Sequence, residues 1–191
     1  MDAVGFLMGP HSIRDEEFSF VSALFFRVAG RGNTSVARGP FLDIHADCQR
    51  VMKGASLSRE EALRHASMAW DAVACDPAAV GPAGGGLGIS FELFEIAMLG
   101  FAEHFTAPFW DWSNADSRSR SARATSAALM WHVLGCITDV TPAGRICKPF
   151  HAVQYAHDAC LEASRRAAAV TLQSVRSAAR SLRCRECQAS S

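Results

Sequence analysis

The sequence predicts an all-α fold, a single-domain bundle of five to six helices that includes a long C-terminal helix rich in arginine and alanine. Apolar residues recur at helical spacing over most of the chain, helix-capping residues precede several of these stretches, and strand-like alternation is nearly absent. The 191 residues are enough for one domain with its own core. We expect an α-helical domain over 1–183, with a hinge or long loop at 76–88, and a C-terminal tail over 184–191.

Two helices are predicted in the first quarter of the chain. Ser12 and Asp15 form an N-cap pair, after which apolar residues recur at helical spacing to about Val28. The stretch AGRGN ends this helix, because glycine accepts the left-handed conformation of a C-cap. Pro40 suits the first position of a shorter helix that reaches Gly54.

A capping box begins the third predicted helix. Ser58 is followed three residues later by Glu61, which predicts a helix through about Ala74. The following segment 76–88, DPAAVGPAGGGLG, is typical of a flexible connection because it consists mostly of proline, glycine and alanine. It lacks the lysine of a phosphate-binding loop, so we interpret it as a connector.

Two further helices follow the connector. Ser90 caps the stretch FELFEIAMLGFAEHF, whose apolar residues occur on nearly every side, and this predicts a central, buried helix that Pro108 ends. Ser113 and Asp116 then form an N-cap pair for a helix through about Cys136. Its Ser/Arg/Ala-rich first half is expected to be solvated and its second half to join the core.

A turn at 141–144, TPAG, precedes the long final helix, which is expected over about 149–183. Small residues form one stripe along this helix and would let another helix approach closely: Ala156, Cys160, Ala163, Ala167, Val170, Ser174 and Ala178. Four arginines share another face through spacings of 11, 4 and 3: Arg165, Arg176, Arg180 and Arg183.

Charge is balanced over the whole chain but divided between its halves. Up to Asn114 there are 14 acidic and 8 basic residues, a net charge of −6, and from Ala115 onward 5 acidic and 11 basic, a net charge of +6. Either the halves pack against each other or the basic half faces an anionic partner. We expect the arginine stripe to contact other protein subunits with an acidic surface. Nucleic-acid phosphates are the alternative partner.

The composition argues against membrane-spanning and secreted classes. No apolar run reaches the roughly 20 residues of a spanning helix, so no transmembrane segment is expected. The first residues lack the basic and apolar regions of a signal peptide. Seven cysteines without regular spacing fit reduced thiols, so we expect an intracellular protein of the cytoplasm or an organelle matrix.

One set of histidines and cysteines is a candidate metal site: Cys147, His151, His157, Cys160, Cys184 and Cys187. The first two are four residues apart and the next two are three apart, so each pair can share a helical face. Zinc takes four such ligands tetrahedrally. The set lacks a second CxxC or an HxxxH at finger spacing, so we expect no cofactor, with zinc as the alternative. A disulfide is the competing use of these cysteines in an oxidising compartment.

The stretch FELFEIAML followed by APFWDW resembles part of tyrosinases and related type-3 copper proteins. In that family a helix of the pattern HRxYLxxFExxL, which carries a copper ligand, precedes a PYWDW turn. Phe94 and Glu95 match the FE pair, and 108–112 matches the turn with Phe109 in place of tyrosine. Leu87 stands where the family has a copper-binding histidine. The resemblance therefore implies packing residues at this aromatic corner rather than copper ligands.

No catalytic motif is recognised, neither HExxH nor GxSxG among them. The sequence therefore favours a non-catalytic helical interaction module, an accessory or structural subunit of a larger assembly. One alternative is a metal-dependent or redox enzyme that uses the histidine and cysteine set near the Trp-Asp-Trp corner. The other is nucleic-acid binding through the arginine stripe.

Overall fold

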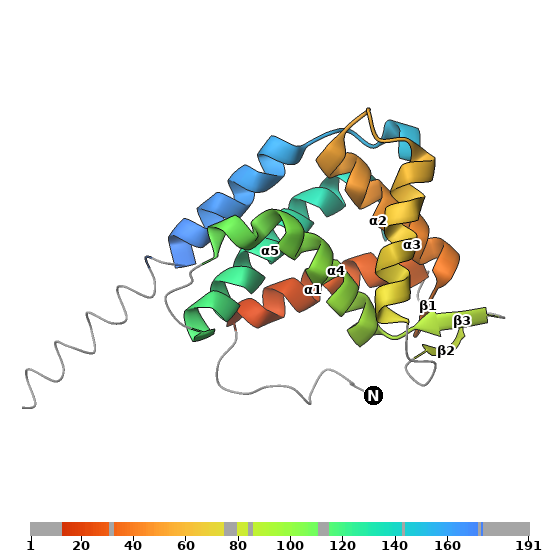
Figure 1. The fold of residues 1–191 in the computed structure, drawn as a ribbon, viewed down its shortest axis with the longest axis horizontal. Coiled ribbons are helices and arrows are strands. Elements are labelled where there is room, and N and C mark those ends of the chain that lie inside the picture. The colour runs from red at the N-terminus through yellow and green to blue at the C-terminus, as the bar shows by residue number, and fades with distance from the viewer. Residues whose placement is uncertain are drawn as a thin grey trace, which may run out of the picture.

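The structure is a computed structural model that describes residues 13–30, 33–74, 80–83, 86–110, 115–142, 144–171 and 173. It is mostly helical (Figure 1), as the sequence predicts. Five α-helices are α1 (Ile13–Gly30), α2 (Arg38–Lys53), α3 (Arg59–Val73), α4 (Phe91–Thr106) and α5 (Ala115–Ile137). A further helix over 157–171, which we call the last helix, lies beside α5. Short 3-10 helices are η2 (Ala107–Phe109) and η3 (Phe150–Ala152).

Two small antiparallel sheets correct the expectation of a fold without strands. The strands are β1 (Val36–Ala37), β2 (Val80–Ala83), β3 (Gly86–Ile89), β4 (Thr138–Thr141) and β5 (Gly144–Cys147). β3 pairs with both β1 and β2, and β4 pairs with β5 across the predicted turn at 141–144. The connector at 76–88 therefore contains paired strands. Strands of two to four residues are too short to show alternation, and β1 and β3 lie far apart in the chain.

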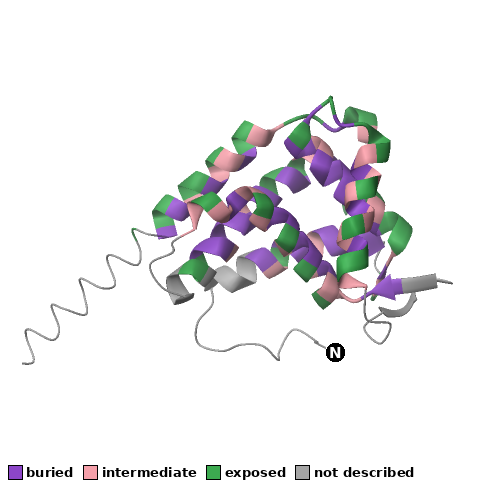
Figure 2. Cartoon of the chain, in the orientation of Figure 1, coloured by how far each residue is buried: buried purple, intermediate pink, exposed green. Residues whose placement is uncertain are grey.

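The core lies between α1, α2, α4 and α5, with α3 packed on α2 (Figures 1 and 2). Phe26 of α1 meets Phe94 of α4 edge to face, with ring centroids 5.5 Å apart. Phe41 of α2 contacts both Phe94 and Trp70, at centroid distances of 6.0 and 5.3 Å. Burying such rings stabilises the fold by roughly 1.5–3 kcal/mol each, so this aromatic cluster holds four helices together.

The local capping signals place the starts of α3 and α4 correctly, whereas α2 begins at Arg38, two residues before Pro40. The Ser58 side chain accepts a hydrogen bond from the Glu61 backbone N–H at 3.1 Å, which confirms the capping box of α3. Ser90 stands at the N-cap of α4 but makes no side-chain bond to the helix backbone there. Gly54 ends α2 with a φ of 81°. The predicted cap pairs at Ser12 and Ser113 lie outside the described residues.

The environment of α4 differs from the prediction that it is buried on every side. Phe94, Met98 and Phe101 are buried, but Ile96 is 58% exposed. The exposed positions recur at every fourth residue: Glu92, Ile96, Gly100 and His104. One face of α4 therefore meets solvent, even though that face includes an apolar side chain.

Within the first half of α5, the stretch 121–126 is more buried than predicted. Ser121, Thr125 and Ser126 are at most 1% exposed, although the composition of this stretch indicates a solvated surface. These residues can be buried because their hydroxyl groups form hydrogen bonds inside the protein. Thr125 Oγ1 donates to Ser121 O at 2.7 Å, and Ser164 Oγ of the last helix donates to Thr125 O at 3.1 Å. Short polar side chains thus allow α5 and the last helix to pack closely.

The last helix begins at 157 rather than at 149. The residues before it form η3 and an extended segment, in which the Ala156 N–H donates to Val51 O of α2 at 2.9 Å. Its buried face consists of Cys160, Ser164, Ala168 and Thr171. This face is offset by one residue from the predicted small-residue stripe, of which Ala163 and Ala167 are half-buried and Val170 is 57% exposed.

None of the described helices has both the length and the apolar character that would let it cross a membrane.

Candidate functional site

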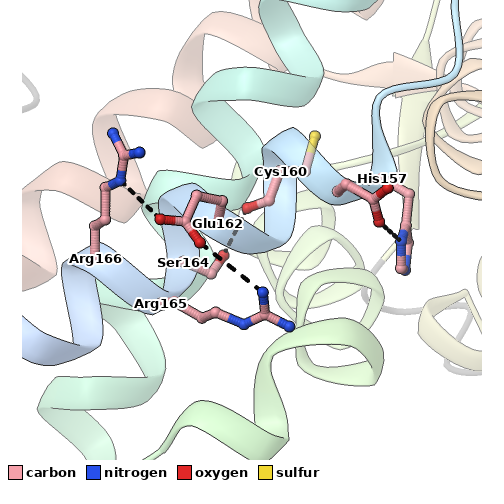
Figure 3. Close-up of polar contacts among 7 residues, drawn as sticks. His157, Cys160, Glu162, Ser164, Arg165 and Arg166 are labelled. Atoms are coloured by element: carbon pink, nitrogen blue, oxygen red, sulfur yellow. Dashed lines mark hydrogen bonds and ion pairs between the residues drawn. The ribbon is translucent and has the colours of Figure 1, made fainter.

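Four of the six predicted metal-binding residues are described. Cys147 is exposed on β5 and His151 is exposed on η3, whereas Cys160 is buried on the last helix. His157 lies 3.3 Å from Asp158, Nδ1 to Oδ1, and its side chain and that of Cys160 project in different directions (Figure 3). Within the described part of the chain, no three histidine, cysteine or acidic side chains are grouped to hold a metal ion. Cys184 and Cys187 lie outside the described residues.

Two of the described thiols, those of Cys147 and Cys160, have raised pKa values. Desolvation and the nearby charges of Asp47 and Asp43 raise the pKa of Cys147 to about 11. Desolvation, with a smaller contribution from Cys136, raises the pKa of Cys160 to about 12. Both thiols are therefore protonated near pH 7, while the thiolate is the reactive form.

The predicted arginine stripe is represented by Arg165 alone, because Arg176, Arg180 and Arg183 lie outside the described residues. Arg165 is exposed and lies 3.9 Å from Glu162 in its own helix, and Arg166 donates to the same carboxylate at 3.0 Å (Figure 3). The Arg165 guanidinium also stands over the Phe109 ring, 5.4 Å from its centroid. Arg165 therefore contacts the aromatic corner after α4.

That corner packs against neighbouring helices. The Trp110 indole N–H donates to Thr106 Oγ1 at 3.2 Å, and Thr106 Oγ1 lies 3.2 Å from Ser126 Oγ on α5. Trp110 itself is half-buried rather than enclosed in the core. Asp111 and Trp112 lie outside the described residues. Trp110, the described residue of the Trp-Asp-Trp motif, thus contacts residues at which α4 and α5 pack together.

An apolar groove lies between α1, α5 and the last helix. Its volume is about 600 Å³. Alanines from two helices keep it open: Ala124, Ala127, Ala128, Ala163 and Ala167. Phe20, Trp131 and Val170 form its edges and are 58%, 46% and 57% exposed. We call this surface the apolar groove.

Two aromatic side chains dominate the groove. The rings of Phe20 and Trp131 stack with centroids 6.2 Å apart and an interplanar angle of 26°. The Arg145 guanidinium also stands over the indole, 5.8 Å from the Trp131 centroid. Large apolar side chains that gather on a surface mark binding sites more often than isolated ones do. Sequence periodicity did not reveal this site, because its walls belong to three separate helices.

A second cavity, of about 810 Å³, lies between the end of α1, one face of α2, the start of α3 and the β5–η3 segment. Six aspartate, arginine and lysine side chains line it: Arg27, Asp43, Asp47, Arg59, Arg145 and Lys148. Cys147 and His151 line it as well. It shares no lining residue with the apolar groove. We call it the polar cavity.

Asp47 is the unusual group of the polar cavity. It is 6% exposed, and among the described residues its carboxylate makes no hydrogen bond or ion pair. Burial raises its pKa to about 7, with a further contribution from Asp43 and an opposing one from Arg59. Asp43 instead pairs with Arg59 at 2.9 Å. A carboxyl group that titrates near neutrality can accept or donate a proton at physiological pH.

Comparisons of the chain with protein-family models, with curated proteins and with solved structures find no match. A function for the chain is therefore argued from the geometry of the groove and the cavity.

Proposed function

We propose that the chain is a non-catalytic helical interaction module, an accessory or structural subunit that binds a partner protein in the apolar groove. The observation that supports this most directly is the stacked pair of Phe20 and Trp131, both about half exposed beside a groove floored by alanine. Burying two such rings against a partner provides the aromatic anchors on which binding energy usually concentrates. The groove is open along three helices, a shape suited to a partner helix.

Charge at the groove indicates the chemistry of the partner. The ionisable side chains that line it are His132 and Arg166, of which Arg166 is bonded to Glu162 at 3.0 Å, and no described acidic residue lines it. Arg145 adds a second guanidinium beside Trp131. The complementary partner is therefore an amphipathic helix with large apolar residues on one face and acidic residues flanking them. We place this interaction inside the cell, since the described cysteines are all unpaired thiols.

Two other functions stay hypotheses without a supporting site among the described residues. The metal-dependent or redox enzyme depends on Cys184 and Cys187 to complete its ligand set, and the nucleic-acid-binding protein depends on Arg176, Arg180 and Arg183. Those residues lie beyond the described part of the chain.

Synthetic peptides test the groove directly. Two 18-residue amphipathic helices would share one leucine face and differ only in carrying glutamate or lysine beside it. We expect fluorescence anisotropy to show tighter binding of the glutamate peptide, with an affinity that falls as salt rises. Trp131→Ser should weaken binding at least tenfold.

A matched control keeps this experiment decisive. Ile96 on α4 is as exposed as Phe20 but lies outside the groove, so Ile96→Ser should leave binding unchanged. Equal losses in both variants would point to unspecific hydrophobic adhesion. Tighter binding of the lysine peptide would overturn the proposed partner chemistry. Native mass spectrometry of the complex from its own cell then identifies the partner, and a purified chain that is monomeric and without a partner there would count against the proposal.

A further inference from the structure

The polar cavity has an excess of positive charge. Four cationic side chains line it, against the two carboxylates of Asp43 and Asp47. The Arg59–Asp43 ion pair cancels one charge of each sign. Lys148 is directed elsewhere, because its Nζ donates to Cys136 O at 3.0 Å and lies 3.7 Å from Asp139.

Two guanidinium groups then have no carboxylate partner. Arg27, exposed in the last turn of α1, makes no ion pair or hydrogen bond among the described residues. Arg145 on β5 donates to the neutral Thr138 hydroxyl at 3.0 Å. Guanidinium groups bind carboxylate and phosphate oxygens through paired N–H donors. The cavity therefore offers recognition for an anionic group that the protein itself does not supply.

Most of the remaining lining is apolar. Ile146 on β5 is 54% exposed and Phe150 on η3 is half-buried, and Val28 and Pro40 also line the cavity. A volume of about 810 Å³ is in the range of cavities that enclose most of a small organic molecule. A free inorganic ion would leave these apolar walls uncovered.

We propose that the polar cavity binds a small organic anion, with its charged group at Arg27 and Arg145 and its apolar body against Ile146 and Phe150. Asp47 makes this binding depend on pH. In its neutral form the carboxyl group donates a hydrogen bond to the anion, and in its charged form it repels the anion.

The sign of that dependence follows from the surroundings of Asp47. The groups that face the cavity with it are Asp43 on α2, Arg27 on α1, Arg59 on α3, Arg145 and Cys147 on β5, and Lys148 and His151 after it. The pKa of Asp47 is about 7 in the empty cavity, and a bound anion raises it further. Affinity for the anion is thus highest below pH 7 and falls as pH rises through that value.

The probe is 2-naphthoate, whose carboxylate, with a pKa of about 4, stays charged from pH 6 to pH 8. Binding is followed by NMR shift titration of the full chain at both pH values. We expect saturable binding that weakens about tenfold at pH 8. Acetate, which lacks an apolar body, and 2-naphthylmethylamine, which carries the opposite charge, should bind at least tenfold more weakly than naphthoate at pH 6.

Variants assign the interaction to residues. Arg27→Gln should weaken naphthoate binding at least tenfold at both pH values, whereas Arg64→Gln, an exposed arginine of α3 outside the cavity, should not. Asp47→Asn should bind naphthoate with the same affinity at pH 8 as at pH 6. His151 also lines the cavity and is ionisable. The contribution of Asp47 is therefore measured as the difference in pH dependence of binding between the wild type and Asp47→Asn.

Several results would overturn the proposal. These are tighter binding of the amine, equal binding of acetate, an unchanged affinity of Arg27→Gln, or a pH dependence that is undiminished in Asp47→Asn. Arg27 is exposed and unpaired among the described residues, so its variant tests the site even if Asp47→Asn alters the fold. Neither variant touches the apolar groove, so a failure here leaves the proposed partner binding standing.

Discussion

The indole N–H of Trp110 donates to Thr106 Oγ1 at 3.2 Å, and the same threonine oxygen contacts Ser126 on α5. Thr106 is fully buried and also donates to Ala102 O at 3.0 Å. One hydroxyl group therefore connects the end of α4, the aromatic corner and α5.

Trp110→Ala should destabilise the protein by about 2 kcal/mol. The full cost of removing a buried aromatic ring is about 3–5 kcal/mol, and Trp110 is only half-buried. Trp110→Phe keeps most of the ring and loses only the N–H donor, so about 1 kcal/mol is expected. Urea unfolding of both variants measures this. An alanine variant as stable as the wild type would show that the corner serves something other than stability.

Helix positions could be predicted because their signals are local. Ser58 and Glu61 are three residues apart, and the start of α3 depends on little else. The pairing of β1 with β3 could not, since it joins Val36 to Ile89, far apart in the chain. The β2–β3 pairing is local, but each strand has only four residues, too few to show alternation. The start of the last helix was predicted too early, because the segment before it instead bonds to α2 through Val51.

The two cavities lay beyond sequence reasoning for the same reason. Phe20 and Trp131 come from α1 and α5, and no spacing in the sequence relates them. Asp47 is an ordinary polar residue of a helix until the packing of α1 and β5 buries it. The metal-site prediction pairs Cys147 with His151 through a spacing of four residues, but Cys147 lies on β5 and His151 on η3, so these two residues share no helical face.

His45 and Asp47 should give opposite pH dependences of stability. Burial raises the pKa of Asp47 from 3.8 to about 7, so this carboxyl group loses its proton at a lower pH in the unfolded state than in the folded state. The free energy of unfolding therefore falls as pH rises between those values. Burial lowers the pKa of His45 from 6.5 to about 4, so stability falls as pH drops from 6.5 to 4. Its Nδ1 is buried without a hydrogen-bond partner among the described residues, which fits a neutral ring.

Between pH 4.5 and 6.5 the two contributions offset each other, each amounting to about 2 kcal/mol. As pH rises across this interval, the free energy of unfolding of Asp47→Asn should therefore increase by about 2 kcal/mol relative to that of the wild type. His45→Phe, which keeps an aromatic ring beside Phe41 and Phe101, should lose about as much. Urea titrations at the two pH values test this. Parallel profiles for the two variants and the wild type would contradict it.

Two serines at helix starts allow a matched comparison. Ser58→Ala removes the hydrogen bond to the Glu61 N–H and should cost about 1 kcal/mol. Ser90→Ala removes a serine from the same position of α4, where the side chain makes no bond to the helix backbone. Its cost should be clearly smaller, because only a bond to the Glu92 side chain is lost. Thermal unfolding compares the stabilities of the two variants. Equal losses of stability would indicate that the Ser58 hydroxyl does not act by capping α3.

Two glycines should respond to alanine with opposite signs. Gly54 has a φ of 81°, and an added Cβ would stand 3.0 Å from the Tyr155 ring, so Gly54→Ala should destabilise by about 1–2 kcal/mol. Gly100 lies on the exposed face of α4 with nothing within 4 Å of an added Cβ. Gly100→Ala should stabilise by about 1 kcal/mol, since alanine favours the helix. Denaturant unfolding of both variants decides the matter. A stabilised Gly54→Ala variant would mean that Tyr155 and the end of α2 adapt to the methyl group without strain.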